Sequence, residues 1–500
     1  MAVRELILAP DAHTWVALAR EYAAAREADQ ARRERAGRFR AELGLPVDGL
    51  LVMSGHQASF WHAGILAKRL TLGTFAGQFN AAAAWCIVDQ DTEDFSTLRA
   101  PVRSATGGWE VGQLNLAPES TRMQIAADVP ASALPAFDVV PTPIQKAATP
   151  GVAAGLDQII AAVQTAAHRN SSAPATVAPD PLTSTSRSAA DQIEAATSIL
   201  LTQRGLIGDQ ASVTIFLATR IGRTALFRAV LDHFETDPHA AAERYNAALA
   251  AAPDARLTPL RIGASAAQIE LPIWRIERGA PRKRVYADQL ARCRAEGANL
   301  VPRALLMTGL LRAAGCDLFI HGLGGAGHAT EQGQGGYDRA TGAWLTPLLG
   351  PLAPTVLATA TVTLDLGIEG DVGASVDGSA DDAASIDRAV WKAHAAEHSP
   401  ALLGDELAGV RKAALVATLK RERDPLARRA LYRQVHDLLS RVRAANATEL
   451  GALHDRAAAL AARKEEFALA RDRTFGWPLH SDDDLRALAR QIAREFQVRP

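Results

Sequence analysis

Short apolar segments rich in β-branched and aromatic residues alternate with helical patterns along this chain, and this alternation limits the possible folds more than any other feature. Five segments have this character: Gly49–Met53, Ala84–Val88, Val213–Ala218, Asp317–His321 and Val356–Leu364. After the first of them, apolar residues at Ile65, Leu66 and Leu70 predict a helix, and another helical pattern starts near Arg223. Because parallel strands need long crossover connections, the alternation predicts an α/β fold with a mostly parallel sheet of short, buried strands.

The two ends of the chain have a different texture. Residues 11–45 are rich in Ala, Arg and Glu with helical spacing, so we expect helices there. Near the other end, two apolar series recur at heptad-like intervals, and they are Leu431, Val435, Leu438 and Val442, then Leu453, Leu460 and Phe467. Asn446 and Gly451 can break the run between them. The pattern predicts a C-terminal coiled-coil hairpin that makes a homodimer, with two ordinary amphipathic helices on the core as the alternative.

Two stretches of loop-like composition suggest where the parts of the chain meet. Residues 170–191 are dominated by Ser, Thr, Ala and Pro, and residues 367–385 by Gly, Ser and Asp. The predicted organisation is a helical segment (1–45), a first core part (46–168), a linker (169–191), a core continuation with a connecting segment (192–297), a second core part with a glycine-rich loop (298–366), an acidic Gly/Ser linker (367–386) and a helical arm (387–500).

The charges of the chain almost cancel. Its 500 residues include 54 Lys+Arg and 55 Asp+Glu, a formal net charge of −1. This balance argues against a polyelectrolyte-binding surface spread over the whole molecule, so we expect small-molecule partners and no nucleic acid.

No segment approaches the roughly 18 uninterrupted apolar residues that a membrane-spanning helix needs. The apolar run at the N-terminus is broken early by Pro10, unlike a secretory signal. We therefore expect a cytoplasmic protein with no membrane partner. Cys86, Cys293 and Cys316 lie far apart in the sequence, so neither a disulfide framework nor a cysteine zinc site is indicated.

Polar residues follow the first apolar segment, where a parallel sheet would present its ligand-binding edge. We predict a tight turn at Ser54-Gly55-His56-Gln57. The glycine permits close approach of an anion, and His56 and Gln57 can donate to phosphate oxygens. His62 and Lys68 follow and are further binding candidates. The alternative is a simple β-turn in which His56 caps the next helix.

Four carboxylates follow the second apolar segment, at Asp89, Asp91, Glu93 and Asp94. Such a cluster repels itself unless a cation or a proton relieves it. In an extended continuation Asp89 and Asp91 would share a face, so they could bind Mg²⁺ carried by a nucleotide or deprotonate an attacking amine. A solvated acidic loop that caps the following helix is the alternative.

A glycine-rich stretch follows the fourth apolar segment, beginning at Gly322, Gly324 and Gly325. Its spacing is G-x-G-G-x-G, and the residues up to Tyr337 are polar and glycine-studded, unlike the apolar helix of a dinucleotide-binding unit. We therefore predict a loop that closes over a ligand, with His321 at the strand end as a binding candidate. The sequence contains no G-x-x-x-x-G-K-[ST], H-E-x-x-H or G-x-S-x-G motif.

Taken in order, these segments resemble the bacillithiol synthase family. Ser54-Gly55-His56-Gln57-Ala58 is similar to the family's Ser/Thr-Gly-Gln-Gln-Ala, and the stretch from Trp85 to Phe95 is similar to its Trp-Ile-Ala-x-Glu-Asp-His-Asp-Phe. Further similar segments are Arg244–Leu249, Glu270–Trp274 and Pro302–Leu306. His56 stands where the family has Gln, and Thr92 where it has His.

The resemblance implies a Rossmann-like core related to the nucleotidyl-transferase superfamily and a coiled-coil domain that forms a dimer. It also implies a ligase that joins cysteine to the amine of a glucosamine-malate conjugate. Carried over by position, Gly55, His56 and Gln57 would face the substrates, Asp89 and Asp91 would lie opposite, and the loop at Gly324 and Gly325 would complete the pocket.

Amide formation in water requires an activated carboxylate, so we expect ATP or ADP with Mg²⁺ and no tightly bound metal. His56 and Lys68 would offset phosphate charge, and Asp89 or Asp91 would take the proton of the incoming ammonium. Two alternatives remain: a metal-dependent transferase or hydrolase that uses Asp89 and Asp91 with His56 or His62, and an assembly protein whose coiled-coil arm is the working part. The ligase hypothesis requires the His56 turn, the aspartates and the glycine loop to meet around one cavity.

Overall fold

The computed structural model describes residues 5–92, 94–105, 108–121, 124–131, 143–172, 188–207, 213–323, 335–366 and 383–497. The chain divides into two compact units. The first comprises residues 1–366 together with 473–500, and the second comprises residues 367–472. Each unit is described by itself below.

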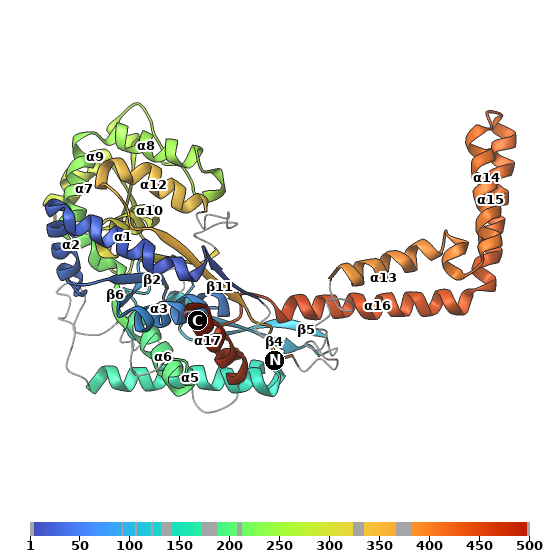
Figure 1. The fold of residues 1–500 in the computed structure, drawn as a ribbon, viewed down its shortest axis with the longest axis horizontal. Helices are drawn as coiled ribbons and strands as arrows, with labels where there is room; N and C mark the ends of the chain where they lie inside the picture. The colour runs from blue at the N-terminus through green and yellow to red at the C-terminus, as the bar shows by residue number, and fades with distance from the viewer. Residues whose placement is uncertain are drawn as a thin grey trace. The chain divides into compact units, whose positions relative to one another are not determined.

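A six-stranded sheet lies at the centre of the first unit (Figure 1). In spatial order its strands are β1 (Glu5–Ala9), β11 (Thr355–Thr361), β10 (Leu318–His321), β2 (Leu51–Gln57), β3 (Ala82–Val88) and β6 (Val213–Leu217). All neighbouring pairs are parallel except β1 with β11, which is antiparallel at one edge. The prediction of a mostly parallel α/β sheet is therefore confirmed, and each of the five apolar segments contains a strand.

The predicted turn at residues 54–57 is wrong, because β2 continues through Gln57. Gly55, His56 and Gln57 pair with Cys86, Ile87 and Val88 of β3. The polar sequence is tolerated because β2 is a central strand whose backbone groups are held by its neighbours, and because Ser54 Oγ donates to the Ile320 carbonyl at 2.7 Å. The chain leaves the sheet after residue 57.

Helices of this unit flank the sheet and its connections. The α-helices are α1 (Trp15–Ala28), α2 (Gln30–Leu43), α3 (Ala63–Phe79), α4 (Pro143–Ala147), α5 (Pro150–Ser172), α6 (Ala189–Gln203), α7 (Ala225–Thr236), α8 (Pro238–Ala250), α9 (Ala287–Ala295), α10 (Ala304–Leu310), α12 (Gly336–Leu349) and α17 (Asp482–Phe496). Shorter helical turns are η1 (Ala12–Thr14), η2 (Glu119–Thr121), η4 (Ala218–Arg223), η5 (Pro253–Ala255), η6 (Ala266–Gln268), η7 (Leu311–Gly315) and η9 (Trp477–Leu479). The helices predicted within residues 11–45 are confirmed as α1 and α2.

One face of the sheet is covered by α3, which packs on β2, β3, β10 and β11. The helix begins at His62, whose Nδ1 accepts the Gly64 N–H at 3.0 Å, and ends at Asn80 in the left-handed conformation. Most of its residues are buried, because α17 packs on its other side. This arrangement returns the C-terminal end of the chain to the first unit.

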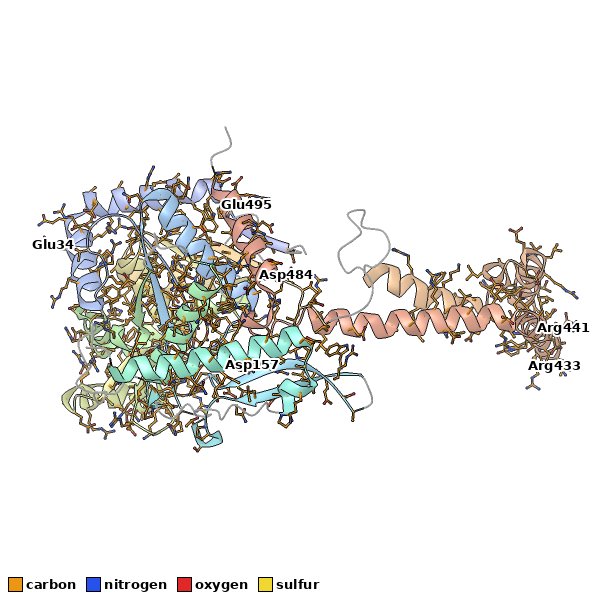
Figure 2. The ribbon with its side chains drawn as sticks, turned by 90° about the horizontal axis from the view of Figure 1, so that it is seen from below. Glu34, Asp157, Arg433, Arg441, Asp484 and Glu495 are labelled. Atoms are coloured by element: carbon orange, nitrogen blue, oxygen red, sulfur yellow. The ribbon has the colours of Figure 1, made fainter. Side chains whose placement is uncertain are left out.

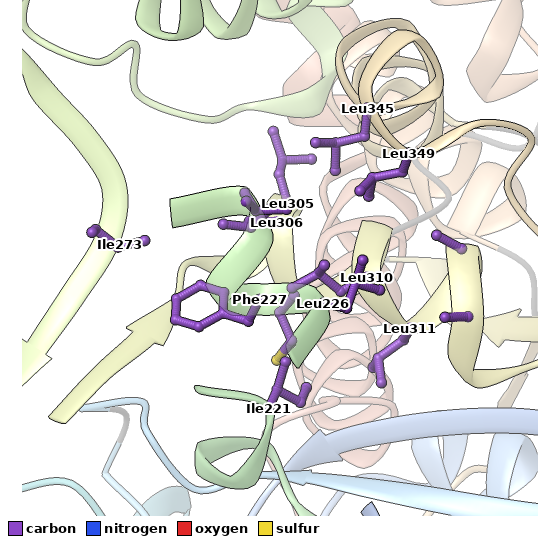
Figure 3. Close-up of a cluster of buried hydrophobic side chains, with 14 of the residues drawn as sticks. Ile221, Leu226, Phe227, Ile273, Leu305, Leu306, Leu310, Leu311, Leu345 and Leu349 are labelled. Carbon is purple, nitrogen blue, oxygen red and sulfur yellow. The ribbon is translucent and has the colours of Figure 1, made fainter. Parts of the chain in front are cut away.

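The opposite face of the sheet carries a large hydrophobic core. Leu51 and Met53 of β2 point into it, together with side chains of α2, α7, α8, α10, η7 and α12. Figure 3 shows part of this cluster, in which Phe227 and Leu226 of α7 lie beside Leu310 of α10. Because alternate residues of a strand face opposite sides, Val52 and Ser54 belong to the α3 face.

Two small antiparallel sheets complete the first unit. One pairs β4 (Thr97–Arg103) with β5 (Trp109–Asn115), and the other has the order β8 (Lys283–Tyr286), β7 (Glu270–Ile276) and β9 (Asn299–Pro302). The sequence analysis had not separated these strands from the helical patterns around them.

The described part of the second unit is helical. Its elements are α13 (Ala383–Ala396), η8 (Pro400–Leu403), α14 (Glu406–Arg421), α15 (Pro425–Ala445) and α16 (Ala447–Ala470). The predicted break at Asn446 is confirmed, since this residue ends α15. The predicted pairing differs from the observed one: α15 packs mainly against α14, and α16 against α13 (Figure 1).

The boundary of the predicted arm, 387–500, is too long at its C-terminal end. Residues 473–500 belong to the first unit, where α17 packs on α3 and β1. The sequence pattern of α17 is that of any amphipathic helix, so its packing partner could not be read from it. Most of the two predicted linkers, 169–191 and 367–386, lies outside the described residues. Among those residues, no helix has the length and apolar character needed to cross a membrane.

Candidate functional site

The carboxyl ends of β2 and β10 are neighbours at the middle of the sheet, where the strand order changes direction. In chain order the parallel strands run outward from β2 through β3 to β6 on one side, and from β10 to β11 on the other. The helix after β2, α3, covers one face, while α12, between β10 and β11, contributes to the core on the opposite face. In sheets of this kind, ligands bind in the crevice at such a switch point.

The contacts of Ser54 and Gly55 are with neighbouring strands of the sheet. Ser54 is fully buried, with its hydroxyl on the Ile320 carbonyl. A Cβ at Gly55 would lie 2.4 Å from the Cys86 carbonyl oxygen, so only glycine fits here. The glycine therefore permits close approach of β3, whereas the sequence analysis had expected it to admit an anion.

His56, His62 and Lys68 come together on the α3 side of the sheet, and we name them the Lys68 cluster. Nδ1 of His56 is buried and has no hydrogen-bond partner among the described residues. Burial lowers the pKa of His56 well below its ordinary value, and the positive charge of Lys68 lowers it further. Burial also lowers the pKa of His62, to about 4, with help from Arg473 and Lys68. Both imidazoles are therefore neutral at pH 7.

Lys68 is the most unusual member of this cluster. Its side chain is 4% exposed, and its Nζ donates to the Gly55 carbonyl at 2.7 Å and lies 5.6 Å from the centre of the Trp85 ring. Within the described part of the chain, no carboxylate forms an ion pair with it. Burial lowers the pKa of Lys68 to about 7. A buried ammonium without a counter-ion is costly, which is the physical reason that its pKa falls so far.

The neighbouring residue, Arg69, is a buried cation that does have a carboxylate partner. Arg69, also 4% exposed, lies 3.8 Å from the carboxylate of Glu194 on α6. Burial raises the pKa of Glu194 to about 7, and the charge of Arg69 opposes that rise. The structure thus provides a partner for Arg69, while the described residues provide none of this kind for Lys68.

Asp89 contacts Thr219 and so ties the end of β3 to η4. One of its carboxylate oxygens accepts the Thr219 N–H at 2.9 Å, and the other accepts the Thr219 hydroxyl at 2.6 Å. Burial raises the pKa of Asp89 to about 7, against the hydrogen bonds from Thr219, which lower it. The prediction that Asp89 and Asp91 share a face is wrong, because the chain bends after β3 and gives the two side chains different partners.

Asp91 meets the end of β2. Its Oδ2 accepts from Gln57 Nε2 at 3.2 Å, and its Oδ1 lies 3.0 Å from the guanidinium of Arg282. Beside them is a small, open hollow lined by Gln57, Ala58, Ser59, Val88, Asp91, Asp94, Phe95 and Ala126. Two predicted site residues, Gln57 and Asp91, therefore do meet at the carboxyl edge of β2 and β3.

His321 lies on the other face of the sheet, at the end of β10. Its Nε2 is 3.1 Å from Asp338 Oδ1, and its ring packs against Tyr337. The Tyr337 hydroxyl is 3.0 Å from the hydroxyl of Thr308, and burial raises the pKa of Tyr337. Burial works to raise the pKa of Asp338, but His321 and Arg312 together hold it below its ordinary value, so this carboxylate is ionised at pH 7.

The described residues of the three segments do not line one common cavity, although some of them are neighbours. Gly322 lies beside the Lys68 cluster, because a Cβ built on it would be 3.6 Å from Lys68 Cδ. Gly324 and Gly325 lie outside the described residues, as does Glu93. His56 and Lys68 lie on the α3 side, while His321 and Tyr337 lie on the α12 side. The predicted residues therefore form separate groups around the ends of β2, β3 and β10.

Several residues of these groups were missed by the sequence analysis, and they are Thr219, Arg282, Asp338 and Arg473. Arg473 NH2 donates to the Thr359 hydroxyl at 2.6 Å and lowers the pKa of His62. None of the four belongs to a recognisable motif, and Thr219, Arg282 and Arg473 reach their groups from distant parts of the chain, while Asp338 directly follows Tyr337. Among the described residues, no group of three or more His, Cys, Asp and Glu side chains is placed to hold a metal ion.

His480, which also influences His62, makes the first unit sensitive to acid. It is 7% exposed, and burial lowers its pKa to about 4, with the charge of Arg204 adding to the effect. Since the unfolded chain takes up this proton near pH 6.5, stability falls as the pH drops from about 6.5 to 4, by about 3 kcal/mol.

We expect His480→Gln to reduce this acid sensitivity. Urea denaturation of the wild type and of the variant at pH 7 and pH 4.5 measures the difference. His13→Gln, at an exposed site, is the matched control and should behave as the wild type does. An unchanged pH dependence in His480→Gln would show that this imidazole is not held neutral.

Comparisons with known proteins place no family on this chain. A scan against protein-family models finds no match, and a search of curated proteins finds none.

Proposed function

We propose that this protein is an enzyme that forms an amide bond between an amino acid, cysteine or a similar one, and an amine such as an amino-sugar conjugate. The observation that carries the proposal is Lys68, a buried ammonium at the switch point of the sheet with no described counter-ion. An enzyme that activates a carboxylate must bind anionic groups, because both the acid and the nucleoside phosphate that activates it are negatively charged.

The strand order supports the proposal of a Rossmann-like core. Numbered along the chain, the five parallel strands have the spatial order 3-2-1-4-5, as in Rossmann-type sheets. This order is what a Rossmann-like core related to nucleotidyl transferases requires. The resemblance to the bacillithiol synthase family stays a proposal, as do ATP or ADP with Mg²⁺ as co-substrate and a homodimer formed through the helical second unit.

The roles of the predicted residues follow from their surroundings. Lys68, with His56 beside it, would hold anionic oxygens of the acid or of a phosphate, and the orphaned Nδ1 of His56 fits such a ligand. Asp91 is the better candidate for taking the proton of the incoming ammonium, because its side chain is 29% exposed at the strand edge. Asp89 is fully buried on Thr219 and would serve to position the end of β3.

Ligand-induced shifts of the melting temperature test the proposal. We expect ATP or ADP with Mg²⁺, cysteine, or glucosaminyl-malate to raise the melting temperature of the wild type by several degrees at a concentration far above Kd. Mass spectrometry of the mixture with ATP should show a product joined by loss of one water. If none of these compounds shifts the melting temperature and no amide forms, the ligase proposal is wrong.

The alternatives predict other results. A metal-dependent transferase or hydrolase using Asp89, Asp91 and His56 or His62 would contain stoichiometric zinc or manganese by elemental analysis. An assembly protein without catalysis would respond to none of the small molecules. The contact between Gln57 and Asp91 at a pocket favours an enzyme over an assembly protein, since polar residues from different strands meet there.

A further inference from the structure

The hairpin of α14 and α15 is strongly basic, although the whole chain is nearly neutral. Between Asp405 and Asn446 there are ten basic and five acidic residues, whereas the chain as a whole has a net charge of −1. The overall balance therefore conceals a local excess of positive charge. The expectation that no nucleic acid is bound came from the overall balance and does not take this segregation into account.

Three arginines lie close together on the exposed surface of the first half of α15. Arg428 and Tyr432 are four residues apart, as are Arg429 and Arg433, His436 is three residues beyond Arg433, and all five are exposed. We name them the α15 basic face. The buried residues of the helix are Val435, Leu439 and Val442. In Figure 2 the labels of Arg433 and Arg441 mark the exposed side chains of this helix.

The arginines of this face are not neutralised within the described part of the protein. No ion pair joins Arg428, Arg429 or Arg433 to a carboxylate of the described residues. Arg428 donates instead to the backbone carbonyls of Leu419 and Glu422, at 3.0 and 2.9 Å. Arg429 and Arg433 are one helical turn apart and repel each other. A polyanion bound on this face would relieve the repulsion.

An exposed aromatic residue lies among these charges. The Tyr432 side chain is 57% exposed, and its ring centre is 4.4 Å from that of His436. Guanidinium groups pair with phosphates, and an exposed aromatic ring stacks on an unpaired base; this combination is typical of proteins that bind single strands. A second copy of the same basic face would be repelled.

We propose that the α15 basic face binds single-stranded nucleic acid, with Arg428, Arg429 and Arg433 on phosphates and Tyr432 stacked on a base. This surface belongs to the second unit, so the inference is independent of the ligase proposal. A nucleic-acid contact and an enzyme site can coexist in one chain without sharing a residue.

Fluorescence anisotropy with labelled 20-nucleotide RNA and DNA strands tests the proposal on the full chain. We expect binding at 50 mM salt that weakens as salt is raised, with a log–log slope of about −2 for three phosphate contacts. The triple variant Arg428→Glu, Arg429→Glu, Arg433→Glu should lose at least about tenfold in affinity. Tyr432→Ala should lose about fivefold with the salt slope unchanged, because stacking involves no counter-ion release.

A matched charge reversal on the first unit is the control. Arg20→Glu, Arg33→Glu, Arg38→Glu changes the net charge equally at exposed positions of α1 and α2 and should keep the affinity within about threefold. Equal losses in both triple variants, or no binding by the wild type at micromolar protein, would overturn the proposal. Binding to phosphatidylserine vesicles without binding to either strand would overturn it in favour of a lipid surface. If circular dichroism shows that the glutamates unfold α15, the corresponding three glutamines make the same test.

Discussion

Replacing Lys68 with Met is expected to raise the free energy of unfolding at pH 7 by about 2 kcal/mol while it removes the binding of anionic ligands. Burial lowers the pKa of this ammonium from 10.5 to about 7. Keeping the amine protonated in the folded protein therefore costs about 5 kcal/mol relative to the unfolded chain. Met keeps the unbranched shape and most of the length of the side chain without the charge. The loss of the hydrogen bond to the Gly55 carbonyl offsets part of the gain.

The pH dependence of this effect has a definite sign. Below pH 7 Lys68 is protonated in both the folded and the unfolded protein, so the burial penalty is at its full size. Between pH 7 and 10.5 the folded protein holds this amine neutral while the unfolded chain binds the proton, and the penalty shrinks. The stabilisation by Lys68→Met should therefore decline steadily from pH 7 to pH 10.5.

Urea denaturation followed by tryptophan fluorescence and circular dichroism at pH 6.5, 8 and 9.5 measures this trend. Lys146→Met, at an exposed lysine of α4, is the matched control and should leave stability nearly unchanged. The ligand shifts of the melting temperature should be lost in Lys68→Met and retained in the control. A variant that is less stable than the wild type at every pH and still binds its ligands would mean that Lys68 only supports the fold.

Replacing Asp317 with Ala should destabilise the first unit by about 4 kcal/mol. This carboxylate is fully buried just before β10, where it pairs with Arg26 of α1 and Arg40 of α2. It also accepts the Leu51 N–H at the start of β2, at 2.9 Å. Removing it leaves buried Arg40 without a counter-ion and leaves Arg26 with only the half-exposed Glu27, a change that typically costs about 3–5 kcal/mol.

The neighbouring pair of Arg26 with Glu27 supplies the control for this prediction. Their separation is 2.8 Å, but the Glu27 side chain is 52% exposed, so Glu27→Ala should cost less than about 1 kcal/mol. Denaturation of both variants at pH 7 gives the comparison. Similar small effects in the two variants would show that Asp317 does not carry the arginine network that joins α1 and α2 to the sheet.

The elements of the sheet could be predicted because each depends on a local pattern. A run such as Ala84–Val88 is apolar throughout, and a strand buried on both faces needs that composition. The extent of β2 could not be predicted in the same way. Ser54 to Gln57 have the composition of a turn, and only the pairing with β3 and the bond from Ser54 to the Ile320 carbonyl keep them in the sheet.

The location of the candidate site could be predicted from the sequence, but the contacts of its side chains could not. Polar residues that end parallel strands must lie at one edge, which is why Gln57 and Asp91 meet. Which group each side chain contacts depends on segments far along the chain. Thr219, the partner of Asp89, is 130 residues away, and nothing in the short runs around either residue indicates the pairing.

The order of residues along this chain determined its alternating strands and helices, the helical ends, and the polar residues beyond the strands, because each of these depends on near neighbours. The tertiary structure alone decided that β2 lies between β3 and β10, that α17 returns to pack on α3, and that Lys68 is buried without a described carboxylate. These outcomes are set by burial and by contacts between distant segments. The free energy of such contacts depends on the surroundings that the whole fold creates.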